Sequence, residues 1–328
     1  MSTPKPPTDQ KSTDAAKEDT EISYANFAVV DRGVCVWAKD IVRENIRYLQ
    51  GLDPAFFVHM GNAHDLTQRP PEAAEAEVAT HHQATALRLT CGIATETLFA
   101  LLGAALQAPY CVFGWMSLYR NKELVDLVER VHTGKPLRVI RPFQPPSWEK
   151  IAATIYSPLP GGSPVPQQFA QAWSRMAEDY LSDHTRDVHN SLKHGLRVAA
   201  GGFSVTATVE DRSVTFTNET SHSYVSLRPI GKSKNHYAIR RTAVPTDAGR
   251  DQAALSIVTA SLSNVIAFLR AQAQEESFEP RLLIPDPDLF ELFAKPGRGV
   301  KSFSFGENIE PRPEEMLSSE EILSIYDD

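Results

Sequence analysis

A short polar segment, residues 183–197, brings together side chains that could bind an anion and move a proton. If the segment is helical, four of them follow one another at steps of four, four and three and share one face. These are Arg186, Asn190, His194 and Arg197. The arginine would neutralise a phosphate, the amide would hydrogen-bond to it, and the histidine would transfer protons near neutral pH. The same row is also typical of a solvated helix face with a cation near its C-terminal end.

The segment supplies candidates for two roles. The candidate catalytic residues are Arg186, Asn190 and His194, and the candidate nucleic-acid contacts are Lys193 and Arg197. His189 and Lys193 form a neighbouring row on the expected helix. Glu96, inside the most apolar stretch, is expected to be buried with Arg120 or His194 as a partner, because an unpaired buried charge is very costly. Exposure of Glu96 at the edge of the bundle is the alternative.

A second basic region spans residues 224–245, which contain no acidic residue. Its basic residues are Arg228, Lys232, Lys234, His236, Arg240 and Arg241. A hairpin here could follow a phosphate backbone, with Tyr224 and Tyr237 available to stack on bases. The alternative is an exposed hairpin whose basic side chains protect its edges against aggregation.

Hydrophobic periodicity predicts the elements that must position these groups. Helices are expected at 32–50, 72–106, 121–132, 148–156, 167–199 and 248–274, with shorter ones near 287–294 and 314–326. Alternating apolar residues predict four strands, at 203–209, 214–216, 224–227 and 236–242. The expected fold is mainly α: a helical bundle with a small antiparallel β-meander inserted before the last long helix, an α+β arrangement.

Composition divides the chain into three parts. Residues 1–22 are polar, with a net charge of −2, and are expected to be a disordered tail. Residues 23–278 are expected to form the bundle domain, with the meander at about 203–245. Residues 279–328 are rich in proline, and their last 22 residues carry eight acids against one arginine. This part is expected to be an acidic C-terminal tail.

The residues around the candidate histidine carry a resemblance. The phrase Asn190-Ser191-Leu192-Lys193-His194-Gly195, late on a long helix, resembles the polar-x3-His helix of HEPN-like proteins. That resemblance implies an all-helical bundle, and many members of the superfamily are metal-independent ribonucleases of toxin, defence and stress systems. Their motif is an Arg, four to six residues, then a His. Here seven residues separate Arg186 from His194 and two separate it from His189, so the spacing departs from the family pattern.

These observations define two functional hypotheses. The first is a metal-independent ribonuclease or RNA-binding protein of HEPN-like type, in a toxin or defence setting. The alternative is a non-catalytic nucleic-acid or protein-interaction module that uses the basic hairpin 224–245 and the acidic tail. RNA, a second copy in a homodimer and a protein partner for the tail are the partners considered.

Other classes of protein are not indicated. The three cysteines form no CxxC pair, and the sequence holds no phosphate-binding glycine loop. No metal site and no cofactor are expected. The uncharged stretch 97–119 favours a buried helix, a turn and a second short helix over a membrane span, and a cytoplasmic location is expected.

Overall fold

The computed structural model describes residues 23–62, 76–193, 197–200, 203–209, 212–218, 221–230, 235–273, 280–295, 303–306, 312 and 316–324. Several of the residues and segments predicted above lie outside this part of the chain. They include the tail 1–22, His194, Lys232, Lys234 and six of the eight acidic residues at the C-terminal end. Within the described part, helices dominate and small antiparallel sheets accompany them, which confirms the predicted fold class.

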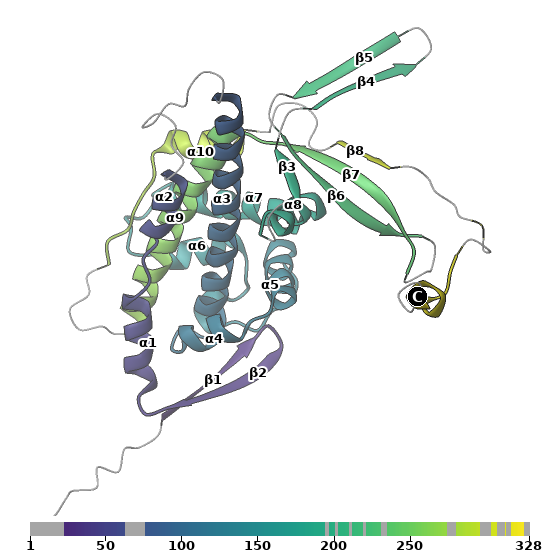
Figure 1. Cartoon of the computed structure of the whole chain (residues 1–328). Coiled ribbons are helices and arrows are strands. Elements are labelled where there is room, and N and C mark those ends of the chain that lie inside the picture. The colour runs from purple at the N-terminus through teal and green to yellow at the C-terminus, as the bar shows by residue number, and fades with distance from the viewer. Residues whose placement is uncertain are drawn as a thin grey trace, which may run out of the picture.

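Two long helices form the centre of the bundle (Figure 1). They are α3 (Ala76–Gln107) and α9 (Ala248–Gln272), and they pack against each other along their lengths. Both are long and apolar enough to cross a membrane by composition, but 67% and 78% of their most apolar stretches are buried inside the fold. Such burial is expected of core helices, which are apolar nearly all round.

The remaining helices surround this pair. They are α1 (Ile41–Gln50), α2 (Ala55–Asn62), α4 (Val112–Leu118), α5 (Asn121–Thr133), α6 (Trp148–Ile155), α7 (Val165–Leu181), α8 (Asp183–Lys193), α10 (Pro287–Ala294) and α11 (Ser319–Ser324), with a 3-10 turn, η1, at Arg141–Phe143. Local signals fix several of their ends. Asp247 caps α9 by accepting a hydrogen bond from the Arg250 backbone N–H, and Gly134 ends α5 with a φ of 67°.

The N-terminal helix predicted at 32–50 is wrong in its first part. Residues up to Ala38 form a hairpin of β1 (Ser23–Val29) and β2 (Arg32–Ala38), and the helix begins only at Ile41. Phe27 and Val34 lie directly opposite each other and pack on the core. The apolar residues of this segment therefore lie on one face of a hairpin rather than on one face of a helix. A further helix, α2, lies between the helices predicted at 32–50 and 72–106.

The single helix predicted at 167–199 is two helices followed by a strand. Ser182, with extended backbone, separates α7 from α8, and its carbonyl accepts the Arg186 N–H as the new helix starts. A serine followed by an acid is a helix-start signal. The break lets α8 turn against α3, and the chain then enters β3 (Val198–Ala200).

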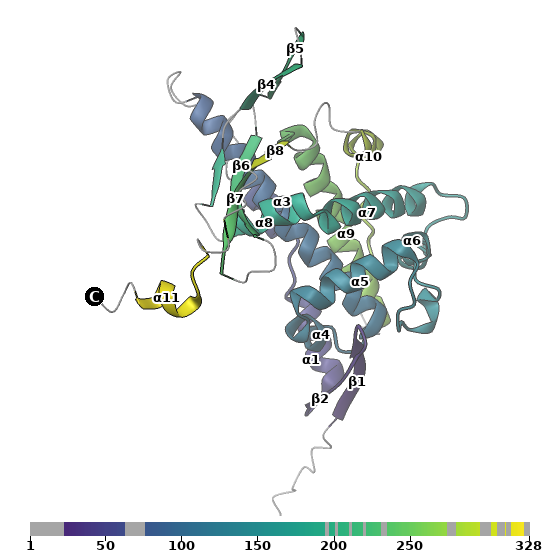
Figure 2. The same ribbon diagram turned by 90° about the vertical axis from the view of Figure 1, so that its right-hand side faces the viewer.

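The four predicted strands are present but belong to two sheets. They are β4 (Phe203–Val209), β5 (Arg212–Asn218), β6 (Ser221–Pro229) and β7 (Tyr237–Pro245). The first two pair only with each other, whereas β6 and β7 are the centre of a sheet ordered β3-β6-β7-β8, where β8 is Phe303–Gly306. Figures 1 and 2 place this sheet beside α8, with the β1–β2 hairpin at the other end of the bundle.

Candidate functional site

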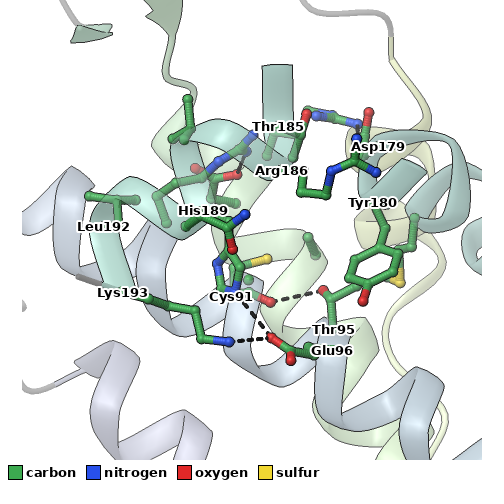
Figure 3. A pocket seen from close by; sticks show the side chains of 18 of the residues that line it. Cys91, Thr95, Glu96, Asp179, Tyr180, Thr185, Arg186, His189, Leu192 and Lys193 are labelled. Carbon is green, nitrogen blue, oxygen red and sulfur yellow. Dashed lines mark hydrogen bonds and ion pairs between the residues drawn. The ribbon is translucent and has the colours of Figure 1, made fainter. Parts of the chain in front are cut away.

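A pocket opens where α8 crosses the bundle, lined by residues of α3, α5, α7, α8, α9 and α10 (Figure 3). It encloses about 140 Å³. Its ionisable side chains are Arg88, Cys91, Glu96, Asp179, Tyr180, Arg186, His189, Lys193, Arg250 and Asp251. The four cations and three carboxylates among these lining residues leave a small excess of positive charge. The walls therefore combine an apolar surface with groups that could attract an anion.

Glu96 is the centre of a charged cluster at the α3–α8 contact. Its Oε2 accepts hydrogen bonds from His189 Nε2 at 3.2 Å and Lys193 Nζ at 2.7 Å. The Glu96 and His189 side chains are each 14% exposed. Hydrogen bonds from His189 and Lys193 outweigh the opposing effect of burial and lower the pKa of Glu96 to about 2. The carboxylate is thus ionised at neutral pH and orients both basic side chains.

His189 is held from both sides. One edge of the imidazole packs on Gly92 of α3, where the absence of a side chain provides the room, and Nε2 faces Glu96. Its other nitrogen, Nδ1, is buried, and the described part of the protein offers it no hydrogen-bond partner. Because Glu96 is an acceptor only, Nε2 carries a proton in this arrangement. A histidine fixed by a carboxylate in this way is positioned for proton transfer.

Two further ion pairs form the inner walls. Arg88 Nη1 lies 2.6 Å from Asp251 Oδ1, and Arg250 Nη2 lies 2.6 Å from Asp179 Oδ2. The Arg250 guanidinium also lies over the ring of Phe293, 4.9 Å from its centre. These contacts tie α3 and α7 to the start of α9. They fix the pocket walls rather than leave cations available for a ligand.

The cysteine in the pocket is a structural group. Cys91 and Cys111 are both buried. Burial raises the pKa of the Cys91 thiol to about 12, so it is not a nucleophile at neutral pH. Among the described residues, no three histidine, cysteine or acidic side chains gather in an arrangement suited to a metal ion.

The structure brings together part of the predicted catalytic row. Arg186 and Asn190 both line the pocket, and the Arg186 guanidinium pairs with Asp183 one turn earlier. Arg197 is exposed in a bend beyond the end of α8, so it does not continue their helical row. His194 lies outside the described residues.

The neighbouring row, rather than the predicted one, contacts the buried acid. Glu96 is indeed largely buried, but its partners are His189 and Lys193 and not Arg120. The four-residue spacing of His189 and Lys193 already placed them on one face of α8. The sequence did not indicate which face of α8 meets α3, because that depends on how the two helices pack.

The predicted basic hairpin is divided between two faces of its sheet. Ser226 lies opposite Arg240, and Ala238 opposite Arg228, so these two arginines share a face, whereas Arg241 belongs to the other. Tyr224 is 4% exposed, so the expectation that it stacks on bases is wrong. Burial, and after it the negative charges of Asp187 and Asp183 of α8, raises the pKa of the Tyr224 hydroxyl. The face that carries Tyr224, Arg228 and Arg240 therefore lies towards α8.

Comparisons with protein families, with curated proteins and with solved structures found no match for this chain. The chemistry of the site therefore rests on the residues that form it. These are a histidine fixed by an ionised carboxylate, with a lysine and an arginine beside it, at a pocket of one-ring size.

Proposed function

We propose that the protein is a metal-independent ribonuclease of HEPN-like type, with its catalytic site at the mouth of the α8 pocket. The observation that carries the proposal is the placement of His189 between Gly92 and Glu96, with Lys193 bound to the same carboxylate oxygen. Arg186 and Asn190 line the same pocket. This set provides a proton-transfer group and cations for a phosphate without a metal ion.

The proposed reaction needs only groups of RNA and of this chain. Once the substrate has displaced Glu96, His189 in the tautomer protonated at Nδ1 uses its free Nε2 to take the proton from a ribose 2′-hydroxyl, whose oxygen then attacks the adjacent phosphorus. The bond from phosphorus to the 5′-oxygen breaks, and that oxygen receives the proton from His189. The products are a 2′,3′-cyclic phosphate and a 5′-hydroxyl end. Lys193 and Arg186 stabilise the charge that develops on the phosphate oxygens.

This mechanism assigns the proton transfer to His189 rather than to His194. In the ligand-free arrangement Nε2 of His189 contacts Glu96, so the substrate must displace this hydrogen bond. Glu96 then keeps Lys193 as a partner at 2.7 Å. Arg186 remains the candidate for phosphate binding. Its partner Asp183 is exposed, and an exposed ion pair is weak, so a phosphate can replace Asp183.

The test is RNA cleavage in the presence of EDTA. Replacement of His189 with glutamine should reduce cleavage about 10²–10⁴-fold, the usual contribution of a proton-transfer group. His184→Gln is the matched control, since His184 lies on the same helix but does not line the pocket. A wild-type protein that leaves RNA intact, or a His189→Gln variant as active as the control, would contradict the proposal.

A second candidate function, a non-catalytic interaction module, has an observation of its own. Val225, Leu227 and Ile239 are 53%, 61% and 56% exposed on the face of the sheet opposite Arg228 and Arg240. Neighbouring exposed apolar side chains on one sheet face are typical of a protein-binding surface. Leu227→Ser with Ile239→Ser should then abolish binding to a protein partner, whereas His189→Gln should leave that binding unchanged. Unchanged binding in the double variant would argue against this interaction surface.

A further inference from the structure

The inner wall of the α8 pocket carries a hydrogen-bond acceptor with nothing to accept from. Asp251 lines the pocket, and its side chain is only 4% exposed. Arg88 occupies Oδ1, but no donor among the described residues contacts the buried Oδ2. A buried carboxylate oxygen without a donor is unfavourable, and such groups in native proteins call for an explanation. Oδ2 is closed to water-sized molecules in the ligand-free arrangement, so a ligand that brings an N–H or O–H donor into the pocket would remove the penalty once the Asp251 side chain turns towards it.

The pocket as a whole, with Asp251 in its lining, has room for one ring. The pocket encloses about 140 Å³, close to the 150 Å³ cavity that is known to hold a benzene ring. Val188, Met176 and Phe293 contribute apolar surface to its lining. A flat apolar body with a polar edge therefore suits the pocket.

The outer part of the pocket has a different character. Lys193, the most exposed member of the Glu96 cluster with 33% of its side chain accessible, lies there with Arg186. Arg186 can turn towards an anion because its partner Asp183 is exposed, and Lys193 has three N–H donors, so it can contact an anion while it keeps Glu96. The pocket thus offers an acceptor for a donor on its inner wall and cations for a phosphate at its mouth.

We infer that the pocket is a base subsite for cytosine, which rests on the proposed function and names its substrate class. The cytosine ring occupies the apolar space, its exocyclic amine donates to Asp251 Oδ2, and the adjoining phosphate reaches Lys193 and Arg186. Carboxylates accept hydrogen bonds from this amine. Uracil has a carbonyl oxygen at the same ring position, and that oxygen would face the Asp251 carboxylate without a proton between them.

Calorimetry with three nucleotides tests the inference on the wild-type protein. Cytidine 3′-monophosphate should bind about tenfold or more tightly than uridine 3′-monophosphate, since the two differ in the group that faces Asp251. Adenosine 3′-monophosphate, whose base has two rings, should bind more weakly than the cytidine nucleotide. Equal affinities for cytidine and uridine nucleotides, stronger binding of the adenosine nucleotide, or no binding at all would overturn the inference.

Two variants locate the binding. Asp251→Asn should abolish the preference for cytosine, and Ala254→Leu should weaken both pyrimidine nucleotides at least tenfold by filling the pocket. The second variant keeps the Arg88–Asp251 ion pair intact, so it separates a blocked pocket from a protein destabilised by an unpaired arginine. Unchanged binding in Ala254→Leu would place the nucleotide elsewhere and overturn the inference.

The two proposals fail in different ways. A protein that binds cytidine 3′-monophosphate in the pocket but leaves RNA intact contradicts the ribonuclease proposal alone. A protein that cleaves RNA through His189 but does not distinguish cytosine from uracil contradicts the base subsite alone.

Discussion

Gly92 of α3 and the imidazole of His189 of α8 are in direct contact across the pocket wall. A Cβ atom at position 92 would lie 2.3 Å from His189 Nδ1 and 2.7 Å from Cε1, well inside van der Waals contact. The ring is confined on its other side by Glu96. Position 92 therefore has to be glycine for His189 to keep its place, although glycine in the middle of a helix costs about 1 kcal/mol relative to alanine.

The first prediction concerns this contact. Gly92→Ala should displace the His189 ring, weaken its hydrogen bond to Glu96 and destabilise the protein by roughly 1–3 kcal/mol, as overpacking does. Gly249→Ala is the matched control, because the nearest atom to its added Cβ is Asp247 Oδ1 at 3.5 Å. Chemical unfolding of both variants is the measurement. A Gly92→Ala protein as stable as the wild type would show that the contact does not constrain His189.

A second prediction follows from the low pKa of Glu96. The unfolded chain takes up this proton near pH 4.5, whereas the folded protein does so near pH 2, where the contacts with His189 and Lys193 are lost. The stability that Glu96 contributes is fully present above pH 4.5 and is lost between pH 4.5 and pH 2. It amounts to about 3 kcal/mol.

The variant Glu96→Gln should therefore be less stable than the wild type at neutral pH and should flatten the pH dependence of unfolding below pH 4.5. Glu149→Gln, at an exposed position of α6, should leave the loss of stability below pH 4.5 as it is in the wild type. If Glu96→Gln and the wild type lose stability in parallel between pH 4.5 and pH 2, the carboxylate does not hold the cluster together.

A third prediction concerns the join between the sheet and the bundle. His222 of β6 is buried, and its Nε2 lies 2.9 Å from Thr85 Oγ1 of α3. Burial, followed by the nearby positive charge of Arg88, lowers the pKa of His222 to about 4. The unfolded chain binds the proton first, so stability falls as the pH drops from 6.5 towards 4, by about 3 kcal/mol in total.

Unfolding measured between pH 7 and pH 4 checks this. His222→Gln, which removes the titrating group and keeps a polar side chain near Thr85, should reduce the loss of stability in that range. His184→Gln serves as the control on α8. An unchanged pH dependence in His222→Gln would mean that another group is responsible.

The fourth prediction uses the division of the sheet into two faces. Replacing Arg228 or Arg240 with alanine should weaken binding to single-stranded RNA and lower the slope of log K against log salt by about 1, as the loss of one phosphate contact does. Arg241→Ala is the control, because Arg241 lies on the opposite face of β7. Equal losses in all three variants would indicate a contact that is not confined to the face towards α8.

The apolar pattern of the long helices made them readable without the structure. The bounds predicted for 121–132, 148–156 and 248–274 agree closely with α5, α6 and α9, because each has a local start or stop signal such as Asp247 or Gly134. The alternating strands of residues 203–242 were found for the same reason. These features depend on neighbours a few residues away, so a single sequence contains them.

Contacts between distant segments were not contained in any local pattern. The β1–β2 hairpin has apolar residues at steps that also fit a helix, and the packing of Phe27 and Val34 on the core formed by later segments decides between them. Likewise, β6 pairs with β3 rather than with β5. Strand pairing is a choice among partners far apart in the chain, and propensity does not make that choice.

The sequence by itself determined a mainly helical protein with a dense polar segment on α8 and a basic strand pair. It also determined that Glu96, in an apolar helix, needed a partner. Only the tertiary structure decided that the partners are His189 and Lys193, because the face of α8 that meets α3 depends on the break at Ser182 and on the space left by Gly92. The contact with Gly92 arises from packing between segments about 100 residues apart, so the spacing within α8 alone does not reveal it.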